Sequence, residues 1–453
     1  MSDKGGTGGG PIAAQAPTQA TGVGPLNLFG LLSYGLLTMP IAMAGLAMLT
    51  YLPTFYAVDM GLGLTSVGIA AVIGRLLDVF TDPLIGHLSD QTRTRFGPRK
   101  PWMAVGIAGF CIAIWFALSP PVGADILYLA LIGASYFLFL TLLDVPYSSV
   151  GLELSSDTRE RTRLASVKAA FQVAGAILAG FFPLILAVPV AQALPQMALT
   201  IIVVAILGFA LFITVIPVPH RNVVRPRLGA MAAFRIIGAH RRFRTLLGAF
   251  ALVQTGNAFF SGLAVLYVTF VLGAEPLIGL MIGLLFLGTA AWLPLWSILE
   301  GRMGKLAAWR TGIVASAIGF ALLALCGPGD TIAIAVLFFL IGGTFGADAV
   351  VPTSILADIA YEQEVQENRR QSGLFVAIKN STSKVAFVVP LAVAFPMLDL
   401  FDFEERAGSD PVANLIFMTF FAAIPILFKL AALGLLSRTG THGLTSLSKV
   451  AAT

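Results

Sequence analysis

The stretch VGIAAVIGRLLDVFTDPLIGHLSD, from Val67 to Asp90, decides the fold class of this protein. It is apolar and longer than the roughly 20 residues that cross a bilayer as a helix, yet it contains Arg75, Asp78 and Asp82. Their i, i+3, i+7 spacing predicts that all three lie on one helix face. A charge at membrane depth costs at least about 2.5 kcal/mol, so it turns toward a partner or a wet cavity. The stretch therefore predicts a membrane helix with a functional polar face.

The acid pair within this helix suggests cation binding. Asp78 and Asp82 are four residues apart and can share one small cation. They can also share one proton, because adjacent carboxylates resist ionising together. The alternative is that Arg75 simply neutralises Asp78 as a buried scaffold pair.

Composition places the whole chain in the membrane. Its 453 residues are 57% hydrophobic and 11% charged, with a mean hydropathy of +0.89, far from soluble globular proteins. We expect an all-α polytopic membrane protein. Apolar spans separated by charged or Gly/Pro-rich breaks predict twelve helices, at 30–58, 65–88, 102–120, 125–154, 164–188, 197–218, 245–272, 276–299, 308–326, 331–359, 372–397 and 411–436.

The distribution of Lys and Arg predicts the orientation. Loops after odd-numbered helices contain one basic residue, Arg406, whereas loops after even-numbered helices contain nineteen: Arg93, Arg95, Arg99, Lys100, Arg159, Arg161, Arg163, seven Arg between Arg221 and Arg244, Arg302, Lys305, Arg310, Arg369 and Arg370. Basic loops stay in the cytoplasm, so both termini are predicted to be cytoplasmic. The net charge of +5 then reflects topology and not binding of nucleic acid.

An internal repeat predicts two halves. Pro83 and Pro294 correspond at an offset of 211 residues, and Pro146 and Pro352 at an offset of 206, each followed by similar charged segments. Two such halves predict six-helix bundles related by an axis along the membrane normal, with the solute site between them. The predicted segments are a disordered cytoplasmic tail (1–27), the first bundle (28–219), a basic cytoplasmic linker (220–244), the second bundle (245–437) and a cytoplasmic tail (438–453).

The loop between the second and third helices resembles the acidic-then-basic loop of the major facilitator superfamily. Asp90 is followed by Arg93, Arg95 and Arg99, and charge pairs between helix ends would hold the cytoplasmic side shut. The alternative is a positive-inside anchor without a gating role.

Longer segments resemble the glycoside, pentoside and hexuronide cation symporters, the family of the melibiose permease. The resemblance rests on RLLDVFTDPLIGHLSDQTRTRFGPRKPW, LDVPYSSVGLEL, ERTRLASVKAAF and RRQSGLFVAIKNSTSK, and it extends from about Tyr34 to Arg438. It implies a cation site at Asp78, Asp82, Thr141 and Asp144. It also implies that Lys168 and Lys384 approach the acids.

Oxygen ligands of this kind suit sodium, lithium or a proton rather than a transition metal. Thr81 replaces an asparagine of the melibiose permease beside the second acid, which leaves the choice of ion open. No other cofactor is expected.

The substrate contacts depart from the family pattern. The acid that follows Tyr-Gly by eight residues in the melibiose permease falls on Ala42, counted from Tyr34, and its sugar-stacking tryptophan falls on Ser148. The resemblance implies that Asp144 is the remaining sugar-contacting acid. Further substrate candidates are Tyr34, Tyr147, Ser148, Asp348 and Lys379, with Lys379 either pairing with Asp348 or facing an anionic solute.

The leading hypothesis is a monomeric secondary transporter of a bacterial inner membrane, which moves a sugar or glycoside with Na⁺ or H⁺. A close alternative is an amphipathic or lipid-like solute, because the sugar contacts are weakened. An intramembrane aspartyl protease and a non-transporting receptor are the alternatives from other classes. FGADA at Phe345 to Ala349 lacks the second glycine of the GxGD protease loop, and no HExxH, GxSxG or Walker motif occurs.

Overall fold

A computed structural model describes residues 26–92, 94, 96–154, 158–216, 241–367, 372–406 and 410–437. Helices of the first half are α1 (Leu28–Leu36), α2 (Thr38–Leu46), α3 (Leu52–Thr54), α4 (Leu64–Gln91), α5 (Lys100–Leu118), α6 (Ile126–Glu153), α7 (Thr158–Leu186) and α8 (Val190–Val215). The π-helical turns η1 (Ala47–Tyr51) and η2 (Phe55–Asp59) join α2 and α3 into the first span.

Helices of the second half are α10 (Arg241–Leu266), α11 (Ile278–Met303), α12 (Lys305–Leu323), α13 (Thr331–Glu367), α14 (Ser372–Ala386), α15 (Val388–Leu400), α16 (Phe403–Arg406), α17 (Pro411–Met418) and α18 (Ile424–Ser437). Three short elements complete these spans. η3 (Tyr267–Val271) extends α10, η4 (Glu275–Leu277) precedes α11, and η5 (Thr419–Ala423) joins α17 to α18. The eleventh span is interrupted at Phe387, between α14 and α15.

Twelve helical spans among the described residues are long and apolar enough to cross a membrane, which confirms the predicted all-α membrane fold. The predicted limits differ most for two helices. α8 begins at Val190 and not at 197, because Pro195 removes one helical hydrogen bond without ending the helix. α13 continues to Glu367 beyond the predicted 359, because a polar helical turn can extend from the membrane into water.

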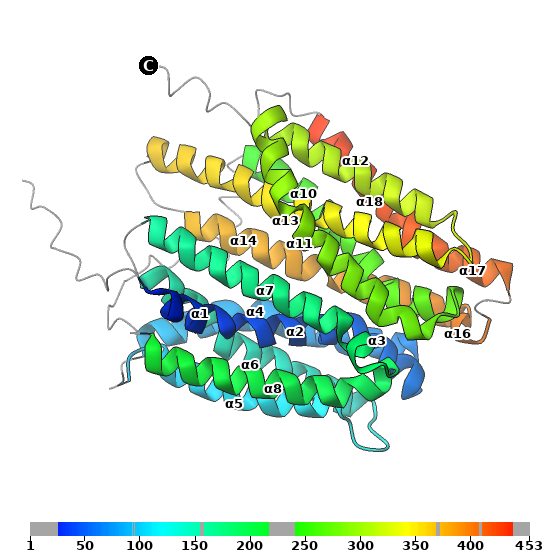
Figure 1. Ribbon diagram of the computed structural model, residues 1–453, viewed down its shortest axis with the longest axis horizontal. Helices are drawn as coiled ribbons and strands as arrows, with labels where there is room; N and C mark the ends of the chain where they lie inside the picture. The colour runs from blue at the N-terminus through cyan, green and yellow to red at the C-terminus, as the bar shows by residue number, and fades with distance from the viewer. Residues whose placement is uncertain are drawn as a thin grey trace, which may run out of the picture.

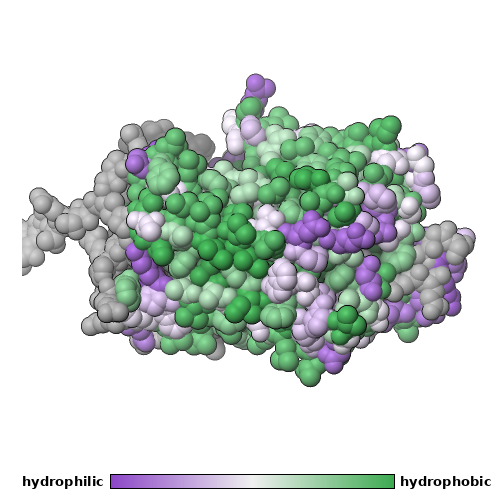
Figure 2. All heavy atoms as spheres, turned by 60° about the horizontal axis from the view of Figure 1, so that its bottom comes forward, coloured by the Kyte–Doolittle hydropathy of each residue, from purple (hydrophilic) through white to green (hydrophobic). Residues whose placement is uncertain are grey.

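The helices form two bundles, with α1–α8 in one and α10–α18 in the other (Figure 1). Figure 2 shows a broad band of hydrophobic side chains across one face of the molecule, as a lipid-facing surface requires. Most of the predicted tails, 1–27 and 438–453, and of the linker, 220–244, lies outside the described residues. The domain limits therefore stay a prediction.

Glycines allow the bundles to touch at the end remote from the basic loops. A Cβ atom placed on Gly180 of α7 would lie 2.9 Å from the Cα atom of Gly283 of α11. One placed on Gly68 of α4 would lie 2.4 Å from the carbonyl oxygen of Leu391 in α15. Neither position can accept a side chain without displacement, so direct backbone contact closes this end.

Candidate functional site

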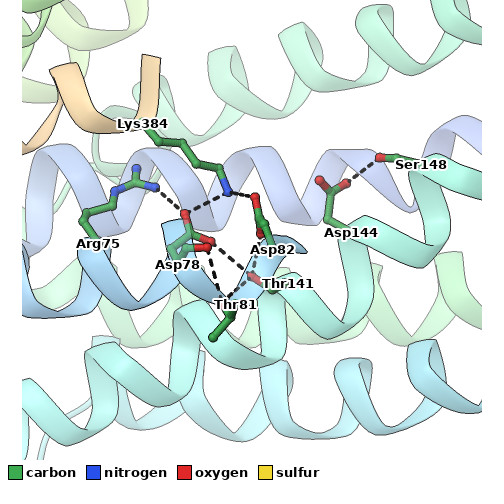
Figure 3. A network of polar contacts seen from close by, with 8 residues as sticks. All are labelled: Arg75, Asp78, Thr81, Asp82, Thr141, Asp144, Ser148 and Lys384. Atoms are coloured by element: carbon green, nitrogen blue, oxygen red, sulfur yellow. Dashed lines mark hydrogen bonds and ion pairs between the residues drawn. The ribbon is translucent and has the colours of Figure 1, made fainter. Parts of the chain in front are cut away.

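The helix face predicted from the sequence lies at the contact between the two bundles. Arg75, Asp78 and Asp82 extend from α4 toward the same region (Figure 3). The Nη1 atom of Arg75 donates to Oδ2 of Asp78 over 3.3 Å, and the Asp78 residue is 2% exposed. Arg75 also lies 4.7 Å from the ring centre of Phe137. Asp78 is thus a buried carboxylate with a guanidinium partner on its own helix.

A hydroxyl group from α6 lies between the two carboxylates. Oγ1 of Thr141 is 3.1 Å from Oδ1 of Asp78 and 3.0 Å from Oδ1 of Asp82. Thr81 contributes a second hydroxyl, which donates to the Asp78 carbonyl oxygen over 3.3 Å and lies 3.5 Å from Oγ1 of Thr141. The structure therefore brings together three of the four predicted cation ligands.

An ammonium group from the other bundle occupies the opposite side of the acid pair. Nζ of Lys384, in α14, is 2.9 Å from Oδ2 of Asp78 and 2.5 Å from Oδ2 of Asp82 (Figure 3). Two carboxylates thus face two cationic side chains, Arg75 and Lys384, and this group of four is formally neutral. The Lys384 ammonium thus contacts both acids at once, through their Oδ2 atoms.

The fourth predicted ligand, Asp144, belongs to a different cluster. Its Oδ1 atom is 3.3 Å from Nζ of Lys168 and 3.4 Å from Oγ of Ser148, and Lys168 donates to that same hydroxyl over 2.7 Å. Asp144 follows Thr141 by three residues on α6, about 4.5 Å further along the helix axis. In this conformation Asp144 therefore lies apart from Asp78, Asp82 and Thr141, and the cation site stays a prediction.

Two predicted substrate residues are buried in the first bundle. The Tyr147 hydroxyl donates to the Tyr34 carbonyl oxygen over 2.6 Å and lies 2.8 Å from Oγ1 of Thr38. Tyr34 and Tyr147 are 3% and 0% exposed, and Phe212 packs against both rings. In this conformation neither ring offers a surface to a solute, although Lys168 lies 4.7 Å above the ring centre of Tyr147.

The expected pairing of Lys379 with Asp348 is wrong. Nζ of Lys379 donates to Oγ1 of Thr353 over 2.8 Å and lies 5.1 Å from the ring centre of Phe250. Asp348 instead pairs with Lys429 of α18, at 2.8 Å. Thr353, the partner of Lys379, lies five residues beyond Asp348 on α13, about 7.5 Å further along the helix axis, so Lys379 meets α13 at a different level.

Lys429 is a buried charge outside the predicted site, although the sequence carries a signal for it. It is the single charged residue in IPILFKLAALGLL, an otherwise apolar stretch. An intramembrane charge needs a partner, and this holds for Lys429 as it does for Arg75.

The predicted gating residues are described only in part. Arg93, Arg95 and the side chain of Asp90 lie outside the described residues. Arg99 is 4% exposed, and its Nη1 atom donates to Oγ of Ser89 over 2.8 Å. A gating role for this loop stays a prediction. Among the described residues, no group of three or more His, Cys, Asp and Glu side chains could hold a metal ion.

Two bundles of membrane helices that enclose charged residues define a transporter of the major facilitator type. The fold agrees with solved transporters: the nucleoside transporter NupG superposes with a TM-score of 0.65 at 12% identity, over 90% of this chain and 99% of that one. A bacterial homologue of the lysosomal transporter Spinster gives 0.67 at 13% identity, over 94% and 100% of the two chains.

The chain belongs to the family of MFS/sugar transport proteins, whose family model matches residues 33–440. It is 24% identical to sodium-dependent lysophosphatidylcholine symporter 1 of Gallus gallus, over 80% of this chain and 77% of that protein. It is 22% identical to a glucuronide carrier protein homolog of Escherichia coli, over 84% and 86%.

A shorter match, 34% identical over 175 residues, links the chain to the uncharacterized symporter sll1374 of Synechocystis and covers 36% of this chain and 31% of that protein. The predicted class, a cation-coupled symporter of an organic solute, is confirmed by this family and these relatives.

Proposed function

We propose that Asp78, Asp82 and Thr141 bind the coupling cation, and that Lys384 neutralises the two acids in its place when the cation is absent. The observation that carries this proposal is the Lys384 ammonium, which contacts both carboxylates at 2.9 and 2.5 Å. An ammonium group in that position balances the charge of the two acids, as the transported cation would.

Charge balance makes the two cations competitors. Arg75 and Lys384 already neutralise the two acids, so an added cation leaves one positive charge in excess at membrane depth. Such an excess is costly in a poorly solvated environment. The bound cation therefore displaces Lys384 from the acid pair.

Displacement of Lys384 would couple binding to movement of the bundles. Asp78 and Asp82 belong to the first bundle and Lys384 to the second, so their ion pairs form a bond between the two. A cation that replaces these ion pairs binds one arrangement of the bundles more tightly than the other, which is what coupling requires. The oxygen ligands suit sodium, lithium or a proton.

The first candidate solute is a sugar or glycoside. Lys168, Asp144 and Ser148 form a polar cluster of hydrogen-bond donors and acceptors, and the Asp144 side chain is 42% exposed. Hydroxyl groups of a sugar need such partners, because an unmet buried polar group costs about 1 to 3 kcal/mol. The membership of the chain in a family of sugar transport proteins supports this candidate.

A second candidate is an amphipathic solute, favoured by an apolar hollow beside Arg75. The hollow lies between α3, α4, α6 and α15 and has Arg75 as its one charged lining residue, with Met48, Leu52, Phe137 and Leu391 among the apolar ones. This apolar lining is better suited to an acyl chain than to the hydroxyl groups of a sugar, which need polar partners. The lysophosphatidylcholine symporter among the relatives supports this candidate.

We further infer that the protein works as a monomer in a bacterial inner membrane with both termini in the cytoplasm. The basic loops support this orientation. Twelve helices in two bundles enclose a site without a second subunit.

Thermal unfolding of the purified protein tests the cation site, because a bound ion stabilises the folded state by linkage. Sodium and lithium would be compared with choline at constant ionic strength, and pH would be varied separately, in the parent protein and in Asp78→Asn and Asp82→Asn. Stabilisation by sodium or by acid that is lost in both variants supports the proposal. Equal responses in all three proteins would refute it.

A further inference from the structure

The second bundle contains a buried ion pair that the proposed cation site does not use. Oδ2 of Asp348 in α13 is 2.8 Å from Nζ of Lys429 in α18, and these residues are 1% and 0% exposed. Nε1 of Trp309 in α12 donates to the other carboxylate oxygen over 2.9 Å. Burial of both charges carries a large desolvation penalty, which offsets much of the attraction between them. Stability alone therefore does not account for this pair, and its contacts with other helices indicate what else it does.

A chain of hydrogen bonds leads from this ion pair to the cation site. Nδ2 of Asn257, in α10, lies 2.9 Å from Oδ2 of Asp348 and 3.2 Å from Oε1 of Gln254. Nε2 of Gln254 then donates to Oγ of Ser383 in α14 over 3.1 Å. Ser383 directly precedes Lys384, the residue that contacts Asp78 and Asp82. The network thus ends one residue from the proposed competitor of the cation.

The network ends on α14. α14 meets α15 at Phe387, one turn beyond Ser383, where the regular helix is interrupted for one residue. Polar contacts that hold α14 to its own bundle are Gln254 with Ser383 and Thr353 with Lys379. The rotation of α14 about its axis decides whether the Lys384 side chain reaches the acid pair.

We propose that Gln254 is a positioning residue, through which the buried Asp348–Lys429 pair fixes α14 and thereby sets how strongly Lys384 competes with the coupling cation. This inference rests on the proposed function, since it assumes that Lys384 and the cation exclude each other. Polar networks in a medium of low dielectric hold their members firmly, because each bond polarises the next.

A double-mutant cycle tests the inference. Gln254→Leu removes the bond to Ser383, so Lys384 loses its fixed position and sodium or protons bind more tightly, by roughly two- to thirtyfold. In the Lys384→Met background the same change has no further effect on the affinity, because there is no competitor left to position. Ser383→Ala removes the other partner of the bond and gives the same pattern, which protects the test if one variant folds poorly.

The experiment measures two midpoints, the sodium concentration and the pH at which half of the thermal stabilisation is reached. Choline replaces sodium so that the ionic strength stays constant. Thr255→Val is the matched control on α10, because its hydroxyl donates to the Ala251 carbonyl oxygen of the same helix. A merely structural role for Gln254 would lower the melting temperature equally in both Lys384 backgrounds and leave these midpoints unchanged, which would overturn the inference.

The outcome separates this inference from the proposed function. If the stability of the parent protein responds to neither sodium nor pH through Asp78 and Asp82, the proposed function and this inference are both overturned. If the parent responds but Gln254→Leu has the same midpoints, or shifts them equally with and without Lys384, this inference alone is overturned.

Discussion

Nζ of Lys384 lies 2.5 Å from Oδ2 of Asp82, although the two residues are 302 positions apart and belong to different bundles. This contact closes a neutral group of two acids and two cations at the centre of the protein. It joins the bundles through charge at one point, while glycines join them by close packing elsewhere. A transporter whose bundles rock must break contacts of both kinds.

Removal of the lysine should expose the acid pair to the cation. We expect Lys384→Met to bind sodium or protons at least roughly tenfold more tightly, because the competing ammonium is gone. The bundles would then lack the ion pairs that join them in the absence of a cation, so net transport should fall although binding improves. Titration of the melting temperature and uptake in proteoliposomes measure the two effects. Lys305→Met is the control, since Lys305 pairs with Asp358 and not with Asp78 or Asp82; equal affinity in both variants would contradict the competition.

The Thr141 hydroxyl should contribute a ligand that serine can replace. Thr141→Ala removes an oxygen within 3.1 Å of both carboxylates, and the expected loss is about 1.5 to 3 kcal/mol of cation binding, as for a hydrogen bond to a charged group. Thr141→Ser should retain most of the affinity. An alanine variant that binds sodium or protons like the parent would remove Thr141 from the site.

The buried pair in the second bundle should be sensitive to loss of one partner. Asp348→Ala leaves the Lys429 charge buried without a carboxylate, and we expect a loss of about 3 to 5 kcal/mol in the free energy of unfolding. Replacement of both residues, as in Asp348→Leu with Lys429→Met, should recover much of that loss. Asp358→Ala is the control, because its pair with Lys305 is 25 to 30% exposed and is worth at most about 1 kcal/mol. Similar melting temperatures for Asp348→Ala and Asp358→Ala would argue against an uncompensated buried charge.

The glycine contact between the bundles should control opening at the end remote from the basic loops. Gly180→Leu places side-chain atoms where the Gly283 backbone lies, and overpacking of about 1 to 3 kcal/mol shifts the equilibrium toward the open arrangement. Hydrogen exchange at residues 278–283 should rise and transport should fall. Gly434→Leu is the control, because nothing lies within 4 Å of a Cβ atom placed there. Unchanged exchange in Gly180→Leu would show that the bundles do not separate at this point.

Predictions from local sequence were most accurate where the cause is local. The apolar spans, the shared face of Arg75, Asp78 and Asp82, and the twelve helices all depend on periodicity and on the length that a bilayer requires. The family resemblance predicts that Thr141 and Lys384 lie near the acids, and the structure gives their distances. It also predicts Asp144 as a ligand, but the contacts of Asp144 are with Lys168 and Ser148.

The sequence by itself determined that this is a twelve-helix membrane protein with a charged face on its second span, because hydrophobic length and helical spacing are properties of neighbouring residues. Only the tertiary structure decided which charges meet. It pairs Asp348 with Lys429 and not with Lys379, and it places Lys384 between Asp78 and Asp82. A buried charge requires a partner, but the helix that provides it is selected by how the bundles pack, and helix packing depends on contacts between distant segments.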